Sequence, residues 1–175
     1  IEDGALKNPS IDKIYGLHLW PDVPGGKVAV KTGVMMAQTG EFDITVYGKN
    51  AHGSMPHKGT DAIVIASELI GLLQSIVSRN IDPFDCALIS IGSIHGGSAR
   101  NVLADKVEMK GTCRALNQEV YSKITNNIKS MSQGLAQATG TKIEYQELHS
   151  YPALDNNATL VDEVIGLLAE NEWVT

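Results

Sequence analysis

The sequence predicts an α+β fold of the βαββαβ (ferredoxin-like) type, which is a four-stranded antiparallel sheet with two helices on one face. Three observations predict it. Apolar and polar residues alternate in several short segments, which is typical of half-buried strands. Apolar residues also recur every three or four positions in two longer segments, which is typical of amphipathic helices. In chain order these segments run strand, helix, strand, strand, helix, strand, the order of a split βαβ unit.

The first strand and the first helix enclose a loop with candidate functional residues. Apolar and polar residues alternate over 41–48, which predicts a strand. A helix pattern runs over about 60–79, and Thr60 is suited to cap it. Between the two, glycines and a proline predict an exposed loop that contains His52. A loop held at both ends by regular structure is a favourable place for chemistry.

Four further elements complete the predicted sheet domain. Turn residues bound a strand pattern at about 86–94, and a second pattern at about 105–115 has one apolar and one polar face. The next helix pattern begins after Asn117, a good N-cap, and ends at Gly140, which can take a left-handed C-cap conformation. A last strand at about 142–148 closes the unit.

The flanks of this unit predict parts of a second domain. The run Ile14–Trp20 is short and apolar, which suits a buried strand with His18 at or near its end. A strand-like segment follows at 27–34, and residues 156–170 show a helix pattern that needs a partner surface. Since the βαββαβ unit already has its two helices, we expect it to be inserted into the second domain, with the chain cut at each end. The expected division is 1–37, 38–150 and 151–175.

Composition excludes several classes of partner. The formal net charge is −6 over 175 residues and the basic residues are scattered, so nucleic acid and anionic membranes are not expected partners. No apolar run approaches the roughly 20 residues of a membrane span, and there is no signal-peptide pattern. Cys86 and Cys113 fit neither a metal-ligand spacing nor a disulfide framework. This favours a reducing compartment and predicts a cytoplasmic protein.

Three polar residues of these segments, besides the loop histidines, have an ordinary structural explanation. His18 could be a core histidine bonded to backbone instead of a metal ligand. Arg114, on the polar face of its strand, could form a surface ion pair with an acid of a neighbouring strand. Asn101 could be a turn residue between two strands. The remaining histidines are interpreted as solvated loop residues: His57, His95 and His149.

Six motifs, in order along nearly the whole chain, carry a resemblance to a known family. They are GLHLWPDVPGG at 16–26, GKNAHGSMPHKGTDA at 48–62, LQSIVSRNIDP at 73–83, GG-x-x-x-NV at 96–102, GTCRAL at 111–116 and YPALDNN at 151–157. In this combination the chain resembles the metal-dependent amidohydrolases and carboxypeptidases of the M20 peptidase family. Within the family it is most similar to the branch of hippurate hydrolases, N-acyl-amino-acid amidohydrolases and auxin-conjugate hydrolases.

The resemblance implies a two-domain enzyme. An α/β catalytic domain, of which 1–37 and 151–175 would be fragments, holds two divalent metal ions: zinc, or alternatively manganese, cobalt or nickel. The smaller inserted domain, here 38–150, is a lid through which two copies form a homodimer.

The resemblance also implies roles for four residues. The matching positions would make His18 a metal ligand and would bring His52 into the active site of the partner subunit. Residues similar to Asn101 and Arg114 hold the carbonyl or carboxylate end of the substrate. The chemistry suits these types, because a donor such as the imidazole of His52 must meet the oxyanion that develops on the amide carbonyl. Arg114 offers a planar fork that fits a carboxylate in two contacts.

The expected function is the lid and dimerisation part of an amidohydrolase that cleaves the amide bond of N-acyl amino acids or small peptides. The family's other metal ligands, including a consecutive Glu-Glu pair, have no counterpart in this sequence. We therefore expect the chain to bind no metal and to be inactive by itself, since one imidazole does not make a dinuclear site. The alternative is a stand-alone βαββαβ module that dimerises or binds a small ligand without catalysis.

Overall fold

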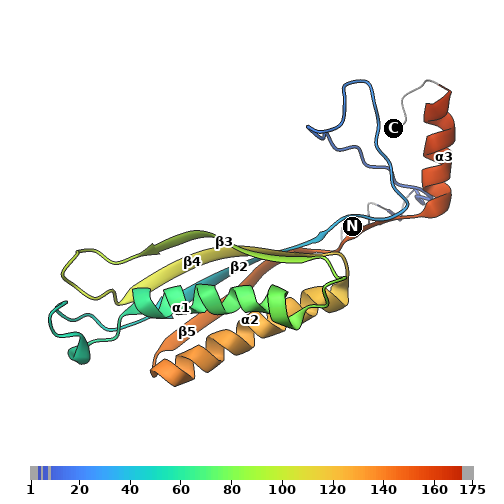
Figure 1. Cartoon of the computed structure of the whole chain (residues 1–175). Coiled ribbons are helices and arrows are strands. Elements are labelled where there is room, and N and C mark those ends of the chain that lie inside the picture. Colours follow the sequence, from blue (N-terminus) through green and yellow to red (C-terminus); the bar gives the residue numbers. More distant parts are fainter. Residues whose placement is uncertain (1–3, 5, 8, 171–175) are drawn as a thin grey trace. The chain divides into compact units, whose positions relative to one another are not determined.

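The computed structural model describes residue 4, residues 6–7 and residues 9–170. These residues group into two compact units. One is continuous, Lys31–Ala158, and contains the predicted inserted domain. The other consists of the two flanking segments, up to Val30 and from Thr159 onward. The larger unit contains three of the four candidate site residues: His52, Asn101 and Arg114. Figure 1 shows its strands and helices.

The larger unit has the predicted βαββαβ fold. Its elements in chain order are β2 (Gln38–Tyr47), α1 (Ala62–Ser75), β3 (Ala87–Gly96), β4 (Lys106–Ala115), α2 (Gln118–Thr139) and β5 (Lys142–Tyr151). The strands form one antiparallel sheet in the order β3-β4-β2-β5. Both helices lie on the same face of this sheet (Figure 1). The predicted fold class is therefore confirmed.

The core lies between the helices and the face of the sheet that they cover. Ile44 on β2 and Met109 on β4 are buried, and Leu69 of α1 and Ile124 of α2 pack in the same cluster. Burial falls on alternate strand residues, because successive side chains of a strand point to opposite faces. The uncovered face therefore carries the polar half of each pattern, and Arg114 belongs to it.

Side-chain caps set the starts of α1 and α2, and one of these two caps was predicted correctly. Asn117 caps α2 by accepting a backbone N–H at 2.8 Å, and Gly140 ends this helix with a φ of 65°, both as predicted. For α1 the predicted cap, Thr60, is wrong. The carboxylate of Asp61 accepts the backbone N–H groups of Ile63 and Val64 instead. The backbone of Thr60 is already paired with Lys49 across the preceding loop.

Strand ends and a second, minor sheet differ from the prediction. β2 begins and β5 ends further out than the patterns indicate, at Gln38 and Tyr151, and a bulge in β5 accompanies the extension. Two short strands, β1 (Gly33–Met36) and β6 (Leu154–Asn156), form a separate antiparallel pair. Strands of three or four residues are too short to show an alternation of apolar and polar residues. The strand-like segment expected at 27–34 is consequently strand only at its end.

In the smaller unit, the run Ile14–Trp20 is not the buried strand that its composition predicts. It has no strand structure, and Leu17 and Leu19 are 85% and 89% exposed. A strand is buried only where neighbours pair with its backbone and cover its side chains. The described residues of this unit supply no such neighbour for the run. His18 is accordingly exposed and is not a core histidine.

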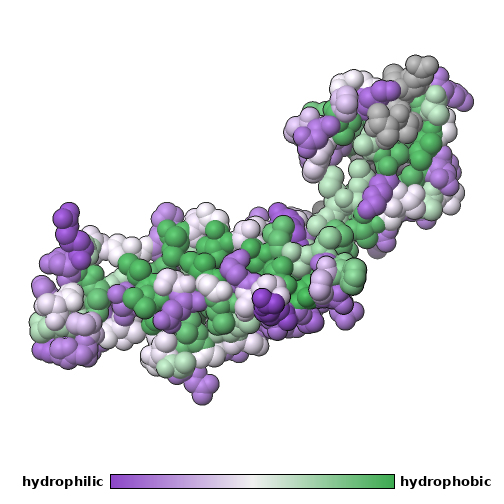
Figure 2. Space-filling model, viewed as in Figure 1, coloured by the Kyte–Doolittle hydropathy of each residue, from purple (hydrophilic) through white to green (hydrophobic). Residues whose placement is uncertain are grey.

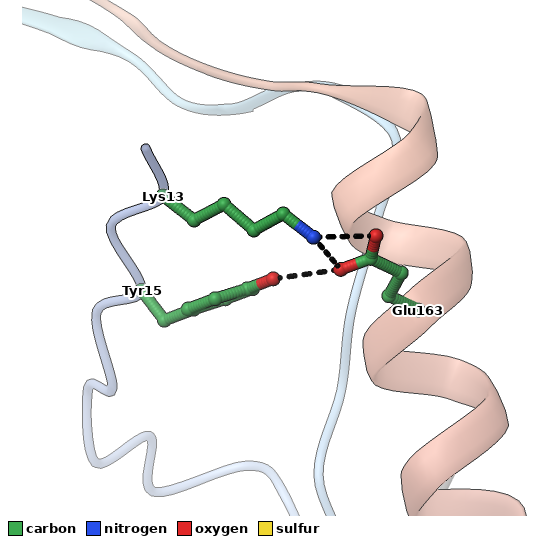
Figure 3. A network of polar contacts seen from close by, with 3 residues as sticks. All are labelled: Lys13, Tyr15 and Glu163. Carbon is green, nitrogen blue, oxygen red and sulfur yellow. Dashed lines mark hydrogen bonds and ion pairs between the residues drawn. The ribbon is translucent and has the colours of Figure 1, made fainter. Parts of the chain in front are cut away.

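The helix predicted at 156–170 is confirmed as α3 (Ala158–Ala169). Two side chains of the N-terminal segment contact it (Figure 3). Lys13 Nζ lies 2.7 Å from each carboxylate oxygen of Glu163, and the hydroxyl of Tyr15 donates to the same carboxylate at 3.1 Å. The hydrogen bond from Lys13 lowers the pKa of Glu163 below its usual value. These contacts join two segments that lie on either side of the βαββαβ domain in sequence.

One helical stretch departs from the expectation that no apolar run approaches the length of a membrane span. The stretch Ala62–Asn80, which is α1 plus a π-helical turn η2 (Ile76–Asn80), is long and apolar enough by length and composition to cross a membrane. Its apolar character has a local explanation, because Ala66, Leu69 and other residues of one side pack in the core. A helix that packs in a protein core meets the same criteria of length and composition.

Candidate functional site

His52 lies in a loop whose two ends are tied together. Lys49 and Thr60 form two backbone hydrogen bonds, of 2.8 and 2.9 Å, which close the loop at its base. Gly48 is packed against this base, since a Cβ there would lie 2.4 Å from the carbonyl oxygen of Thr60. A backbone bond of 2.7 Å closes a turn that starts at His52, and the short 3-10 helix η1 (Pro56–Lys58) follows. The position of His52 is therefore defined by the backbone.

A second loop, between β3 and β4, runs beside the first and carries Asn101. The backbone N–H of Gly53 donates to the carbonyl of Asn101 at 2.8 Å, and the N–H of Leu103 donates to the carbonyl of Ala51 at 2.9 Å. The pair makes an antiparallel bridge at His52. A Cβ on Gly53 would lie only 3.3 Å from the carbonyl oxygen of Asn101, so glycine permits the close approach. Two predicted site residues are thus brought together.

The imidazole of His52 is exposed and is bonded at one nitrogen. Nδ1 lies 2.8 Å from the hydroxyl oxygen of Ser54 and 3.2 Å from the backbone nitrogen of the same residue. Among the described residues, Nε2 has no hydrogen-bond partner. This nitrogen is therefore available to a ligand.

Arg114 lies at the opposite end of the sheet. It pairs with Thr39 near the start of β2, whereas His52 and its loop follow Tyr47 at the end of the same strand. The eight residue steps between Thr39 and Tyr47 correspond to about 26 Å of extended strand. Within one chain, the structure therefore does not bring Arg114 to His52 and Asn101.

Among the described residues, the guanidinium of Arg114 makes hydrogen bonds through only one of its three nitrogens. Its Nη1 donates to the hydroxyl of Thr112 and to the carbonyl oxygen of Cys113, the latter at 3.0 Å. No acid forms an ion pair with Arg114 in the part of the chain that the structure describes, so the surface ion pair considered from sequence is not found. The Nε and Nη2 donors have no partner there either. They form the side of the fork that a carboxylate can use.

The ring of His18 is also bonded at Nδ1. Its Nδ1 lies 2.6 Å from the carbonyl oxygen of Leu19, and its ring packs against Trp20 with centroids 5.7 Å apart. A carbonyl can only accept, so Nδ1 carries a proton, and in the neutral ring Nε2 then keeps its lone pair. That is the state in which histidine binds metal ions. The role of His18 as a ligand stays a prediction.

No metal centre is assembled by the residues that the structure describes. Nowhere among them do three His, Cys, Asp or Glu side chains come close enough to hold a metal ion. The two cysteines are free thiols, and burial raises the pKa of Cys113 to about 11. A metal bound by His18 would therefore need ligands from elsewhere.

The other three histidines are exposed, but two of them are not in loops. His57 lies in η1, whereas His95 and His149 lie in β3 and β5. The interpretation as loop residues was wrong for this pair because both strands run further than their sequence patterns indicate. None of the three lies in the bridge between the His52 and Asn101 loops.

A comparison with protein families decides the affiliation of the chain. The family model described as the peptidase dimerisation domain, of the M20 proteins, matches residues 39–139. The chain belongs to the M20 family. The match runs from β2 to the end of α2 and so includes His52, Asn101 and Arg114. The M20 resemblance inferred from the motifs is confirmed.

Two curated relatives of this M20 chain are named as deacetylases. The N-acetyldiaminopimelate deacetylase of Listeria monocytogenes serotype 4a is 38% identical over 159 residues, which are 91% of this chain and 43% of the relative. The enzyme of the same name from Streptococcus sanguinis is 36% identical over 174 residues, which are 99% of this chain and 46% of the relative. The chain thus spans less than half the length of these relatives.

Solved structures agree with the M20 assignment. A protein proposed to be an aminohydrolase from methicillin-resistant Staphylococcus aureus matches with a TM-score of 0.87 and 33% identity, over 99% of this chain and 46% of that one. The YXEP protein of Bacillus subtilis, described as a dinuclear metal binding peptidase from the M20 family, matches with a TM-score of 0.67 and 26% identity. That match covers 90% of this chain and 39% of the other.

Sequence reasoning missed Ser54 as the partner of the His52 ring. A serine near a histidine has no diagnostic spacing by itself. A weak signal existed, because serine hydroxyls often bond to groups within their own turn, and the loop is rich in turn residues.

Proposed function

We propose that this chain supplies the lid and dimerisation part of a metal-dependent amidohydrolase that cleaves the amide bond of an N-acyl amino acid or small peptide. Its relation to N-acetyldiaminopimelate deacetylases and to a dinuclear M20 peptidase supports this proposal. In the whole enzyme, two divalent metal ions would activate water and polarise the amide carbonyl. His18 would be one of their ligands.

The observation that carries the proposal is the bridge between the His52 and Asn101 loops at one end of the sheet. Both side chains can donate a hydrogen bond. In this proposal they meet the oxygen of the scissile carbonyl, on which negative charge develops during attack. A donor held in advance at such a position contributes roughly 3 kcal/mol of transition-state stabilisation.

Arg114 would bind the carboxylate of the substrate through the unpaired side of its guanidinium. Because this residue is about 26 Å of strand away from the His52 end, one active site cannot take all three residues from a single chain. The proposal is therefore a homodimer. Each active site would take Arg114 from one subunit and His52 with Asn101 from the other.

The two outer strands of the sheet differ in how well they suit such a dimer. β5 carries charged residues that oppose pairing with a further strand: Lys142, Glu144 and Glu147. β3 has His95 as its one ionisable residue. α1 packs on β3 and β4, and it exposes three apolar side chains: Ile63, Val64 and Leu72. Figure 2 shows hydrophobic residues over α1 and β3. We place the dimer contact along β3 and α1.

Complementation between inactive variants tests this arrangement in the full-length protein. H52A and R114A should each lose activity. A mixed dimer of the two has one complete site, which combines Arg114 of the H52A chain with His52 of the R114A chain. Random mixing should therefore restore about a quarter of the wild-type activity.

The matched control mixes H52A with N101A. Both residues come from the same subunit in the proposed site, so no mixed dimer contains a complete site and activity should stay absent. If H52A and R114A mix into dimers without regaining activity, the division between subunits is wrong. If H52A alone keeps wild-type activity, His52 has no catalytic role.

A second candidate function is a βαββαβ module that dimerises or binds a small ligand without catalysis. It is favoured by the limits of the family match, 39–139, which fall within the βαββαβ unit. A full-length protein that forms dimers but hydrolyses no N-acyl amino acid, with or without added divalent metal, would support this candidate over the first.

A further inference from the structure

Ser54 contacts the ring of His52 twice. Its hydroxyl oxygen lies 2.8 Å from Nδ1, and its backbone nitrogen lies 3.2 Å from the same atom. Both groups belong to the turn that the N–H of Met55 closes by donating to the carbonyl of His52 at 2.7 Å. The ring is therefore held within its own turn and not by a distant element.

These contacts determine which ring nitrogen carries the proton. A backbone N–H can only donate, so Nδ1 must accept and has no hydrogen of its own. The hydroxyl of Ser54 can then donate to the same nitrogen. A neutral imidazole with an unprotonated Nδ1 has its proton on Nε2. That is the nitrogen of His52 without a partner among the described residues.

We propose that Ser54 is a positioning residue that holds His52 as the Nε2–H tautomer, ready to donate to the developing oxyanion. This inference rests on the proposed function of His52 and adds the group that prepares it. Without the hydroxyl, the ring keeps only the longer contact of 3.2 Å to the backbone N–H. With this single contact the ring can rotate or change tautomer and present a lone pair, which repels an oxyanion. A donor fixed in advance needs no reorganisation when the charge develops.

Kinetics of three variants of the full-length protein give the first test. S54A keeps the backbone N–H but loses the hydroxyl, and kcat should fall about 3- to 10-fold with little change in KM, the ratio expected for one hydrogen bond of ordinary strength. S54T keeps a hydroxyl and should recover most of kcat. S78A is the matched control, because it removes an exposed hydroxyl that donates to the carbonyl of Gln74 at 3.3 Å.

Nitrogen NMR of the ring gives a readout independent of turnover. In the 175-residue chain labelled with ¹⁵N-histidine, the signals of His52 are assigned by their loss in H52Q. The wild-type ring should show an unprotonated Nδ1 and a protonated Nε2. S54A should show a mixture of tautomers, and S54T should keep the wild-type pattern.

The outcomes separate this inference from the proposed function. If S54A keeps either the wild-type kcat or the wild-type ring spectrum, Ser54 does not act through the ring and the inference is wrong, while His52 keeps its role. If H52A is as active as wild type, the proposed catalytic role of His52 is wrong, and the inference about Ser54 is wrong with it.

Discussion

At the scale of single residues, two glycines in the sheet make room for aromatic rings. Gly111 lies opposite Phe42 in the register of β4 and β2, and a Cβ on it would come within 2.3 Å of that ring. A Cβ on Gly40 would lie 2.5 Å from the hydroxyl oxygen of Tyr121. In each case the ring covers a strand position that has no side chain of its own. The sequence does not reveal these pairs, because each joins segments that are distant in the chain.

Replacement of Gly111 by alanine should therefore lower the free energy of unfolding by about 1–3 kcal/mol, since the Phe42 ring has to move. Gly134→Ala is the matched control. It lies in α2 where an added Cβ meets nothing within 4 Å, and alanine should raise stability there by about 0.5–1 kcal/mol. Urea unfolding of both variants measures the difference. Equal stabilities would show that the ring contact does not constrain position 111.

At the scale of elements, a hydrogen bond joins α2 to the outer strand β5. The hydroxyl of Tyr121 donates to the carboxylate of Glu147 at 2.5 Å. Burial, followed by this hydrogen bond, raises the pKa of Tyr121 to about 12. Burial also raises the pKa of Tyr145, whose buried hydroxyl has no hydrogen-bond partner among the residues that the structure describes. The folded protein therefore holds these phenolic protons more tightly than the unfolded chain does.

The stability of the protein should consequently fall as the pH rises above 10. A tyrosine in the unfolded chain titrates near 10, whereas Tyr121 in the folded protein titrates at about 12, so the unfolded state loses its proton first. The contribution is fully present below pH 10 and is lost as the pH rises to about 12. Urea unfolding across this range should show a smaller loss for Y121F than for wild type. Identical losses would contradict the assigned shift.

At the scale of the whole molecule, the proposed dimer depends on an apolar surface of α1. Val64 is half exposed at 50%, and Val64→Asp would bury a charge without a partner if two copies meet there. We expect the dimer dissociation constant to rise at least about 10-fold, as measured by analytical ultracentrifugation of the full-length protein. Gln133→Glu adds a negative charge to an exposed position of α2 and should leave the dimer intact. An unchanged dimer in V64D would exclude α1 from the contact.

Much of the fold of the larger unit was predictable because its signals are local. The alternation in β4 and the caps of α2 at Asn117 and Gly140 each involve residues that are neighbours in the chain. The errors occurred where a distant segment decides the outcome. The run Ile14–Trp20 has the composition of a buried strand, but burial depends on neighbours that composition does not contain. The pairing of β1 with β6 joins two segments that lie before and after the βαββαβ domain in sequence.

The sequence by itself determined the βαββαβ order and the M20 affiliation, and it pointed to His18, His52, Asn101 and Arg114, because periodicity, caps and motifs are local properties of the chain. Only the tertiary structure decided which candidates meet. Backbone bonds between two loops join His52 to Asn101, and the antiparallel register of β2 and β4 places Arg114 at the other end of the sheet. The physical reason is that register and loop-to-loop hydrogen bonds form between residues far apart in sequence, so no local pattern encodes the distance between these residues.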